Sequence, residues 1–467
     1  MREPPASQAE TLFDVRQVGV RLDRLPATRS VWSLVVFLSL GGFFEYYDLF
    51  FTAYIAPGLV RSHILTATTP GLFGTSGIAS FVAAMFSGLF VGTALFSFVA
   101  DKLGRKAVFT YSLLWYTAAT AVMAFQNHVF GLNLWRFIAG IGVGVELVTI
   151  DAYISELVPP HVRGRAFALN QTIQFCAVPF VALLAWRLVP LAPLGVDGWR
   201  WVALIGAGSA ILVWWIRRRV PESPRWLAQH GRLREAERVL ALLEESAAET
   251  HVTVSATTQA QEQPAKGSFS EIWQKPYLSR TLMLVIFNIF QTVGFYGFSN
   301  WVPTLLIQRG IEFTSSLEYT FWIATAAPLG PLLAAFIADR FERKWQIVLA
   351  AFAVGLSGVL FSRMASPAPL IAFGILLTLA NNILSLSFHA YQAELYPTRI
   401  RALAIGFVYS WSRLSVVFSS FVIGFFLDRF GVPGVFVLIA GSMFMVMLAI
   451  GLLGPRTNRI ALESIAR

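Results

Sequence analysis

Twelve apolar stretches constrain the fold of this chain more than any other feature. Each has roughly 20 residues, enough for a helix to cross the hydrocarbon core of a bilayer. Backbone N–H and C=O groups must be paired inside such a segment, which favours helices over open strands. The stretches cover residues 31–56, 76–98, 107–126, 131–155, 166–189, 199–216, 281–306, 317–338, 346–362, 370–393, 402–427 and 433–453. The sequence therefore predicts an all-α membrane protein with twelve transmembrane helices.

The composition and the positions of the charges agree with this prediction. Hydrophobic residues make up 56% of the 467 residues and charged residues 13%, whereas soluble domains have about 25% charged residues. The net charge of +10 does not indicate a nucleic-acid partner, because most of the 36 Lys and Arg lie on one side of the predicted spans. This positive-inside pattern predicts a multi-pass protein of the cell (inner) membrane with both termini in the cytoplasm. We expect a monomer surrounded by membrane lipid.

The predicted helices fall into two sets of six, separated by a polar insert. The insert is rich in Arg, Glu, Gln and Ser and contains an amphipathic pattern over 232–246, which predicts a surface helix. The expected segments are a cytoplasmic N-terminal segment 1–30, a six-helix bundle 31–216, a cytoplasmic linker 217–280, a second six-helix bundle 281–453 and a cytoplasmic tail 454–467.

Two loop motifs occur once in each half of the chain. The segment Ala100–Lys106 recurs as Ala338–Lys344, and Glu156–Arg163 recurs as Glu394–Arg401, both 238 positions later. Two separate motifs at one offset indicate an internal repeat of six helices. Parallel repeats of this kind are a transporter architecture in which the two halves rock around a central site.

These motifs resemble those of a known family. The loop 101–106 resembles the signature between helices 2 and 3 of the major facilitator superfamily, and 136–144, 156–165 and 221–225 resemble motifs of its sugar-porter branch. Ser97, Ala335 and Glu342 replace glycines of the loop signature. The resemblance covers 30–453 and implies the major facilitator fold and secondary transport.

Charged residues of the loop motifs are candidates for a conformational switch. A cluster that forms in one rocking state and breaks in the other biases the equilibrium by its differential energy. The alternative is ordinary surface ion pairs worth under about 1 kcal/mol each. The candidates are Asp101, Arg105, Glu156, Arg163 and Arg165 in the first half, and Asp339, Arg343, Glu394 and Arg401 in the second.

Two carboxylates, Glu45 and Asp48, lie inside the apolar, aromatic run 41–57. Each costs roughly 2.5–3.5 kcal/mol at the centre of a membrane helix, so ionisable residues there indicate function. Three residues apart, they are expected on one face of the helix as a proton site. The alternative for Asp48 is a solvated position near the helix end.

Arg136 is the expected partner of Asp48. Counted from the ends of their spans, the two residues differ in depth by only about 5 Å. In proton-coupled sugar porters, a carboxylate and an arginine at matching positions form the coupling pair, and the resemblance implies this role for Asp48 and Arg136. A static buried pair is the alternative. Glu146, also within a span, is a candidate to relay protons or to pair with Arg413.

The remaining polar residues in the spans are candidates for substrate binding. Gln171 has the sugar-porter spacing and Gln174 follows one turn later, while Gln291 keeps half of the sugar-binding signature of helix 7. Tyr296 stands in place of that signature's asparagine, and His389 lies where helix 10 has lost its own signature. Because the amides that bind sugar hydroxyls are largely absent, the sugar hypothesis is weakened.

Arg413 lies near the middle of predicted helix 11 without an ionic partner in its own helix. An arginine at this depth requires an anion from the protein or from the substrate. The segment resembles organic-anion, nicotinate and aromatic-acid carriers of the superfamily. Aromatic candidates to flank a flat ring are Phe44, Tyr47, Phe295, Tyr296 and Trp411, each of which also fits a simple packing role.

We therefore predict a proton-coupled symporter that imports a small organic anion, an aromatic or heteroaromatic monocarboxylate. The alternatives are a proton-coupled sugar or polyol importer, a drug–proton antiporter and a transporter-like receptor. No nucleophile–base pair, Walker loop or set of metal ligands occurs in the sequence, so we expect no enzyme activity, cofactor or metal.

Overall fold

A computed structural model describes residues 17–66, 69–71, 77–96, 102–208, 215–216, 219–248, 268–337 and 340–457. Its regular structure is helical. The first half contains α2 (Arg29–Arg61), α3 (Gly77–Phe96), α5 (Arg105–Ala124), α6 (Val129–Leu157), α7 (Pro160–Phe175), α8 (Ala177–Leu188) and α9 (Gly198–Ala207). The insert contains α11 (Pro224–Gln229) and α12 (Leu233–Ala248). The second half contains α13 (Tyr277–Ser299), α14 (Val302–Gln308), α15 (Phe313–Ala324), α16 (Leu329–Ile337), α17 (Arg343–Arg363), α18 (Pro367–Glu394) and α19 (Thr398–Leu453).

Nine helices in the described part of the chain are long and apolar enough to cross a membrane. Four of the twelve predicted spans do not each match a separate helix of this set. The sixth corresponds to α9, the eighth is broken into α15 and α16, and the last two run together in α19. Gly431, with φ +65°, interrupts α19 and marks the turn between its two spans.

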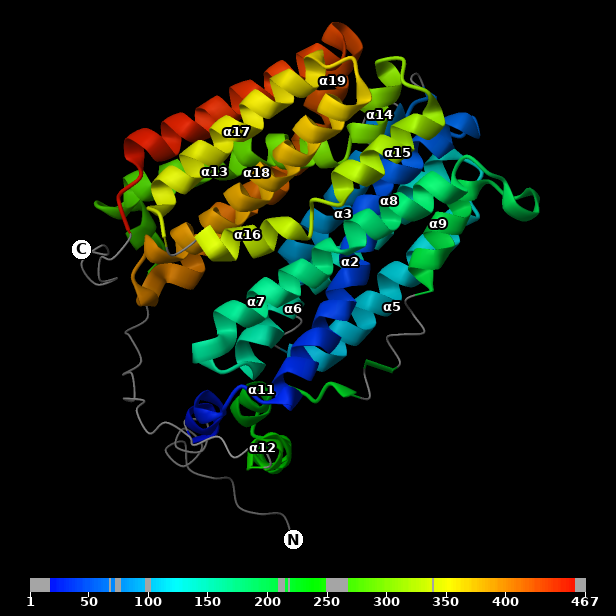
Figure 1. The fold of residues 1–467 in the computed structure, drawn as a ribbon. Helices are drawn as coiled ribbons and strands as arrows, with labels where there is room; N and C mark the ends of the chain where they lie inside the picture. Colours follow the sequence, from blue (N-terminus) through cyan, green and yellow to red (C-terminus); the bar gives the residue numbers. More distant parts are fainter. Residues whose placement is uncertain are drawn as a thin grey trace.

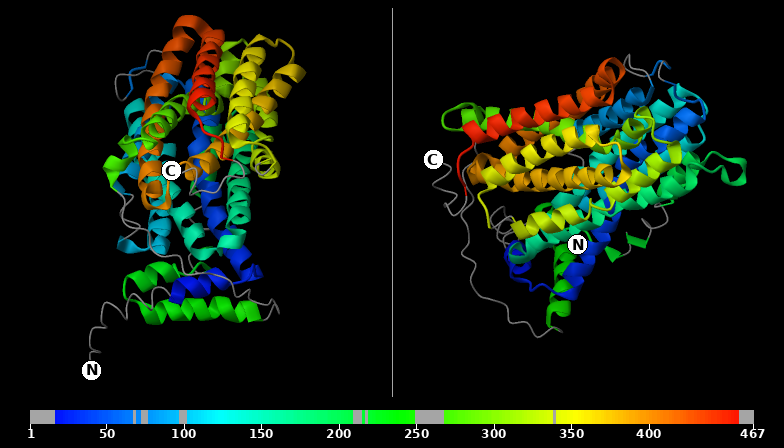
Figure 2. Two further views of the ribbon diagram at one scale, coloured as in Figure 1. Left: turned by 90° about the vertical axis from the view of Figure 1, so that its left-hand side faces the viewer. Right: turned by 45° about the horizontal axis from the view of Figure 1, so that its top comes forward.

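The two halves lie against one another as separate bundles (Figure 1). Their helices are close together at one end and diverge toward the other, where α11 and α12 lie across the end of the first bundle (Figures 1 and 2). One hydrophobic core fills the first half and extends to Phe295 and Val416 of the second, and another lies within the second half. We call the end that carries α12 the α12 end.

The halves contact one another in the middle of the bundles, where Phe86 on α3 lies 4.8 Å from Tyr296 on α13 between ring centroids, and at the end remote from α12. Trp186 on α8 stacks on Phe321 of α15 with ring centroids 5.5 Å apart. Arg61, the last residue of α2, lies 5.3 Å from the centre of the Phe313 ring. Among the described residues, the contacts between the halves at this end are therefore aromatic and cation–π contacts rather than ion pairs.

Small residues bring α3 and α6 into close backbone contact. A Cβ atom on Gly140 would lie 2.3 Å from the carbonyl oxygen of Met85, and one on Gly88 would lie 2.1 Å from that of Phe137. In a membrane the hydrophobic effect does not drive helices together, and small residues stabilise helix pairs by allowing close van der Waals packing.

Gly140→Ala is therefore expected to destabilise the first bundle by about 1–3 kcal/mol, because the added methyl group must displace backbone. Thermal unfolding of the purified protein in detergent measures this. Gly441→Ala is the matched control, since nothing lies within 4 Å of a Cβ at that position in α19. Equal unfolding temperatures for the two variants would contradict the role of Gly140 in packing.

Candidate functional site

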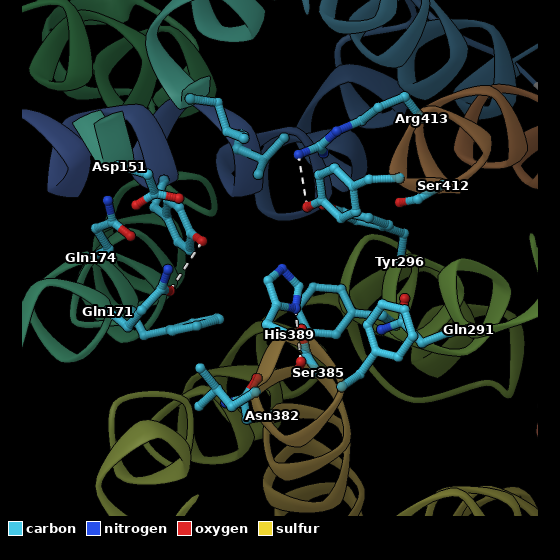
Figure 3. Close-up of a pocket in the computed structure, with 18 of the residues that line it drawn as sticks. Asp151, Gln171, Gln174, Gln291, Tyr296, Asn382, Ser385, His389, Ser412 and Arg413 are labelled. Carbon is cyan, nitrogen blue, oxygen red and sulfur yellow. Dashed lines mark hydrogen bonds between the residues drawn. The ribbon is translucent and has the colours of Figure 1, made fainter. Parts of the chain in front are cut away.

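A central cavity lies between the two halves (Figure 3). Helices α2, α6 and α7 form one wall, and α13, α18 and α19 form the other. About 980 Å³ of space between the walls, including open solvent at the mouth, is free of protein atoms. The polar lining residues are Glu45, Tyr46, Asp151, Gln171, Gln174, Asn288, Gln291, Tyr296, Asn382, Ser385, His389, Tyr409, Ser412 and Arg413.

The wall of the first half carries carboxylates and amides. Glu45 on α2 is buried, and its Oε1 has no hydrogen-bond partner. Asp151 on α6 projects into the cavity (Figure 3). On α7, Gln171 accepts a hydrogen bond of 3.4 Å from the Tyr46 hydroxyl, and Gln174 lies one turn further on. This wall is rich in hydrogen-bond acceptors.

The wall of the second half carries a buried cation. Arg413 on α19 is 3% exposed, donates from Nη2 to the Tyr409 hydroxyl at 3.0 Å, and leaves Nε without a partner. On α18, His389 faces the cavity, and its Nδ1 lies 2.8 Å from the carbonyl oxygen of Ser385. Gln291 on α13 completes the polar part of this wall.

Asp48 and Arg136, which the sequence predicts as partners, are in contact inside the first half. Arg136 Nη1 lies 2.9 Å from Asp48 Oδ2, and its Nη2 donates to the Asp48 carbonyl oxygen at 2.5 Å. The Thr120 hydroxyl donates to Asp48 Oδ1 at 2.6 Å, and Thr52 accepts from Arg136. The Phe51 ring lies 4.4 Å from the guanidinium carbon. The pair is thus buried and hydrogen-bonded on several sides.

The two carboxylates of α2 do not share one environment. Glu45 lines the cavity, whereas Asp48 faces α5 and α6 and does not line it. Residues three apart differ in direction by about 60° around a helix, which suffices here to separate them. Glu146, close behind α2, is fully buried; its Oε2 accepts from Ser112 at 3.5 Å and its Oε1 has no partner.

The structure places two other predicted site residues away from the cavity. Tyr47 is buried against α9, where its hydroxyl donates to the carbonyl oxygen of Val202 at 2.6 Å. Trp411 lies beside Phe407 and does not line the cavity. The neighbours Tyr46 and Ser412 line it instead, because one residue along a helix turns the side chain by about 100°.

Several cavity residues were absent from the predicted site. Asn288 lies three residues before Gln291 on α13. This spacing places both side chains on the same face of the helix. The others are Tyr46, Asp151, Asn382, Ser385, Tyr409 and Ser412. Asp151 lies near the end of the predicted span 131–155, a position that fits a solvated carboxylate as well as a functional one.

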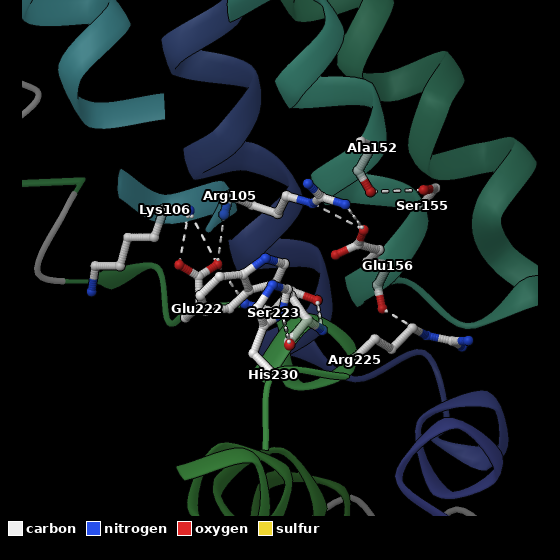
Figure 4. Close-up of polar contacts among 10 residues, drawn as sticks. Arg105, Lys106, Ala152, Ser155, Glu156, Glu222, Ser223, Arg225 and His230 are labelled. Atoms are coloured by element: carbon white, nitrogen blue, oxygen red, sulfur yellow. Dashed lines mark hydrogen bonds and ion pairs between the residues drawn. The ribbon is translucent and has the colours of Figure 1, made fainter. Parts of the chain in front are cut away.

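A charged cluster joins α5, α6 and α11 at the α12 end of the first half (Figure 4). Arg105 lies 2.9 Å from Glu156. Glu222 accepts from the backbone N–H groups of Arg105 and Lys106 at 2.9 and 3.1 Å and so caps the start of α5. Arg225 donates to the carbonyl oxygen of Glu156 at 3.3 Å. The motif after the sixth span therefore ties the insert to the bundle.

The second half has a related contact between Arg343 and Glu394. Two further arginines of the motifs donate to backbone rather than to a carboxylate: Arg163 to Val158 and Arg401 to Tyr396. Glu156, another switch candidate, pairs with Arg105 and, within the described residues, not with Arg163. Arg165 is exposed, and the predicted switch residues Asp101 and Asp339 lie outside the described residues.

If these clusters bias the rocking equilibrium, Glu156→Gln is expected to change the transport rate about fivefold or more while substrate affinity stays within twofold. Initial rates and equilibrium binding of the same preparation measure the two effects. Glu235→Gln is the control, since Glu235 forms an exposed pair with Arg232 on the insert and such pairs contribute little. Equal rates for Glu156→Gln and Glu235→Gln would contradict the switch.

Comparison of the sequence with known protein families identifies the family of the whole chain. The sequence model described as "Sugar (and other) transporter" matches residues 34–467. The chain belongs to this transporter family. As a family member it is 29% identical to the niacin transporter NiaP of Acinetobacter baylyi, over 95% of this chain and 98% of that protein. It is 24% identical to the benzoate transport protein of the same organism, over 88% and 87%.

The family fold is also seen in a solved structure. The inward-open xylose transporter XylE of Escherichia coli superposes with a TM-score of 0.71 at 20% identity, over 93% of this chain and 99% of XylE. The expected twelve-helix, two-repeat major facilitator fold is thus confirmed, and the protein is a membrane transporter of this superfamily.

Proposed function

We propose that the protein imports a small organic anion, an aromatic or heteroaromatic monocarboxylate, together with protons by alternating access. The proposal rests on the position of Arg413. In the part of the chain that the structure describes, this buried cation lines the cavity without a carboxylate in ion-pair contact. Leaving a charge buried and unpaired is costly, and a substrate carboxylate supplies the missing partner with bidentate geometry.

Aromatic side chains around the cavity favour a flat substrate. Tyr46 and Phe50 on α2, Phe175 on α7, and Phe295 and Tyr296 on α13 all line it. Offset or edge-to-face contacts with a ring add to the apolar area that binding buries. The relatives named for niacin and benzoate, both aromatic acids, support this substrate class.

Proton coupling is assigned to the Asp48–Arg136 pair. Protonation of Asp48 removes the charge that holds Arg136 and so releases the pair. Glu45 in the cavity and Asp48 in the pair are one turn apart on α2. A small rotation or shift of α2 therefore links the protonation state of the pair to the shape of the substrate cavity.

Uptake into proteoliposomes tests this function. Labelled nicotinate, benzoate and glucose are compared under an inward proton gradient, with and without an uncoupler. Neutral aromatic acids cross bilayers unaided, so uptake by protein-free liposomes is subtracted. We expect protein-dependent, uncoupler-sensitive accumulation of a carboxylate and none of glucose. Glucose accumulation without carboxylate uptake would overturn the proposal.

A further inference from the structure

The two walls of the cavity have opposite hydrogen-bonding character. The first half presents acceptor oxygens from Glu45, Asp151 and Gln174. The second half presents the guanidinium of Arg413 (Figure 3). In Figure 3, Asp151 and Gln174 lie on one side of the cavity and Arg413 and Ser412 lie on the other. A carboxylate held by Arg413 satisfies only one of these walls.

The acceptors on the first wall lack donors. Glu45 is 1% exposed and Gln174 is 4% exposed, yet Oε1 of each has no hydrogen-bond partner. Asp151 is exposed, and within the described residues its carboxylate has no hydrogen bond or ion pair. Buried polar atoms in proteins are nearly always paired, and an unpaired one is unfavourable. Oε1 of Glu45 and Oε1 of Gln174 are therefore placed for a donor that the protein does not supply, and the exposed Asp151 carboxylate faces the same cavity.

The donor on the opposite wall is likewise incomplete. Arg413 Nε is buried and unpartnered, and Nη2 donates to the neutral hydroxyl of Tyr409. Aromatic rings of Phe50, Phe175 and Phe295 line the same cavity. A ligand that satisfies both walls has an acceptor at one end, a flat apolar middle and a donor at the other end.

We propose that the substrate is bipolar: a ring carboxylate that also carries an amino or hydroxyl donor or a cationic nitrogen, which Glu45, Asp151 and Gln174 bind. This inference rests on the proposed function, since it takes Arg413 as the carboxylate site. It extends that function by giving the first half a direct part in substrate selection. Because each half binds one end, a bipolar substrate bridges the two bundles as they close.

Binding measurements on the purified full-length protein test this inference. The probes are benzoate, 4-hydroxybenzoate, 4-aminobenzoate and N-methylnicotinate, measured by titration calorimetry in one detergent. A hydrogen bond to a charged group favours the donor-bearing acids by about tenfold or more. We therefore expect at least one of the two donor-bearing probes, 4-hydroxybenzoate and 4-aminobenzoate, or the cationic N-methylnicotinate to bind about tenfold more tightly than benzoate.

Asp151→Ala is expected to remove most of this preference while leaving the affinity for benzoate within about threefold. A merely structural role of Asp151 would weaken all four probes together and leave their ratios unchanged, which would overturn the inference. Asp428→Ala is the matched control, because Asp428 is exposed and does not line the cavity. Glu45→Gln, which keeps the side-chain size, provides a second variant if Asp151→Ala does not fold.

The outcomes separate this inference from the proposed function. If benzoate binds as tightly as the other three probes and Asp151→Ala changes no ratio, the substrate need not be bipolar, but carboxylate binding stands. If none of the four carboxylates binds the wild-type protein, the role of Arg413 fails and the inference fails with it. If the wild-type protein prefers one of the other probes over benzoate and Asp151→Ala removes this preference, the result supports both the inference and the proposed function.

Discussion

Asp48→Asn is expected to abolish accumulation of the organic anion against its gradient while exchange of substrate across the membrane continues. The carboxylate accepts from Arg136 at 2.9 Å and from Thr120 at 2.6 Å. An amide keeps the approximate shape but cannot take up and release a proton. The substrate cavity does not include Asp48, so binding is expected to change by less than about threefold. Accumulation and counterflow in the same proteoliposomes measure the two activities.

The substitution also leaves Arg136 buried and without its counter-charge. Breaking a buried pair in this way costs about 3–5 kcal/mol, so low yield of the single variant is expected. Asp48→Asn combined with Arg136→Gln removes both charges and is expected to recover stability without recovering accumulation. If either properly folded variant accumulates substrate as the wild-type protein does, Asp48 is not the coupling site.

Arg413→Ala is expected to lower affinity for the carboxylate substrate by at least about 30-fold, since truncating one partner of a buried charge pair costs about 2–5 kcal/mol. Arg413→Lys keeps the charge but loses the planar fork, so an intermediate affinity is expected. Equilibrium binding to purified protein measures both. Arg363→Ala, at the exposed end of α17, controls for the loss of one cation.

The loss of affinity expected for Arg413→Ala is confined to anionic ligands. The variant should bind neutral analogues such as benzamide about as well as the wild-type protein does, because the aromatic lining remains. Near-normal affinity of Arg413→Ala for nicotinate or benzoate would show that another group holds the carboxylate. Equal loss for benzoate and benzamide would instead show collapse of the cavity.

The fold was predictable because bilayer thickness sets the length of apolar runs and the loop motifs repeat at one offset. What hydropathy did not predict was the interruption of the eighth span between α15 and α16. Pro328 lies in that break, and proline removes a backbone donor. The turn at Gly431 depends on a positive φ that glycine adopts at little cost.

The depth of the candidate site residues in the membrane was predictable from the sequence. The direction in which their side chains point around each helix axis was less predictable. Counting residues from the ends of the predicted spans places Asp48 and Arg136 at similar depths, because the rise per residue of a helix is nearly constant. The same counting could not decide whether Tyr46 or Tyr47 faces the cavity, or that Glu45 and Asp48 point to different neighbours. Those directions are set by how α2 packs on α7, α8 and α9, which local sequence does not encode.

Proton movement measured during substrate entry tests the central claim most directly. Nicotinate is added to proteoliposomes without an imposed proton gradient, and an internal dye reports the lumenal pH. The proposed mechanism predicts acidification beyond that of protein-free liposomes, in proportion to nicotinate uptake, and no excess acidification with Asp48→Asn. Protein-dependent nicotinate uptake without excess acidification would contradict proton coupling.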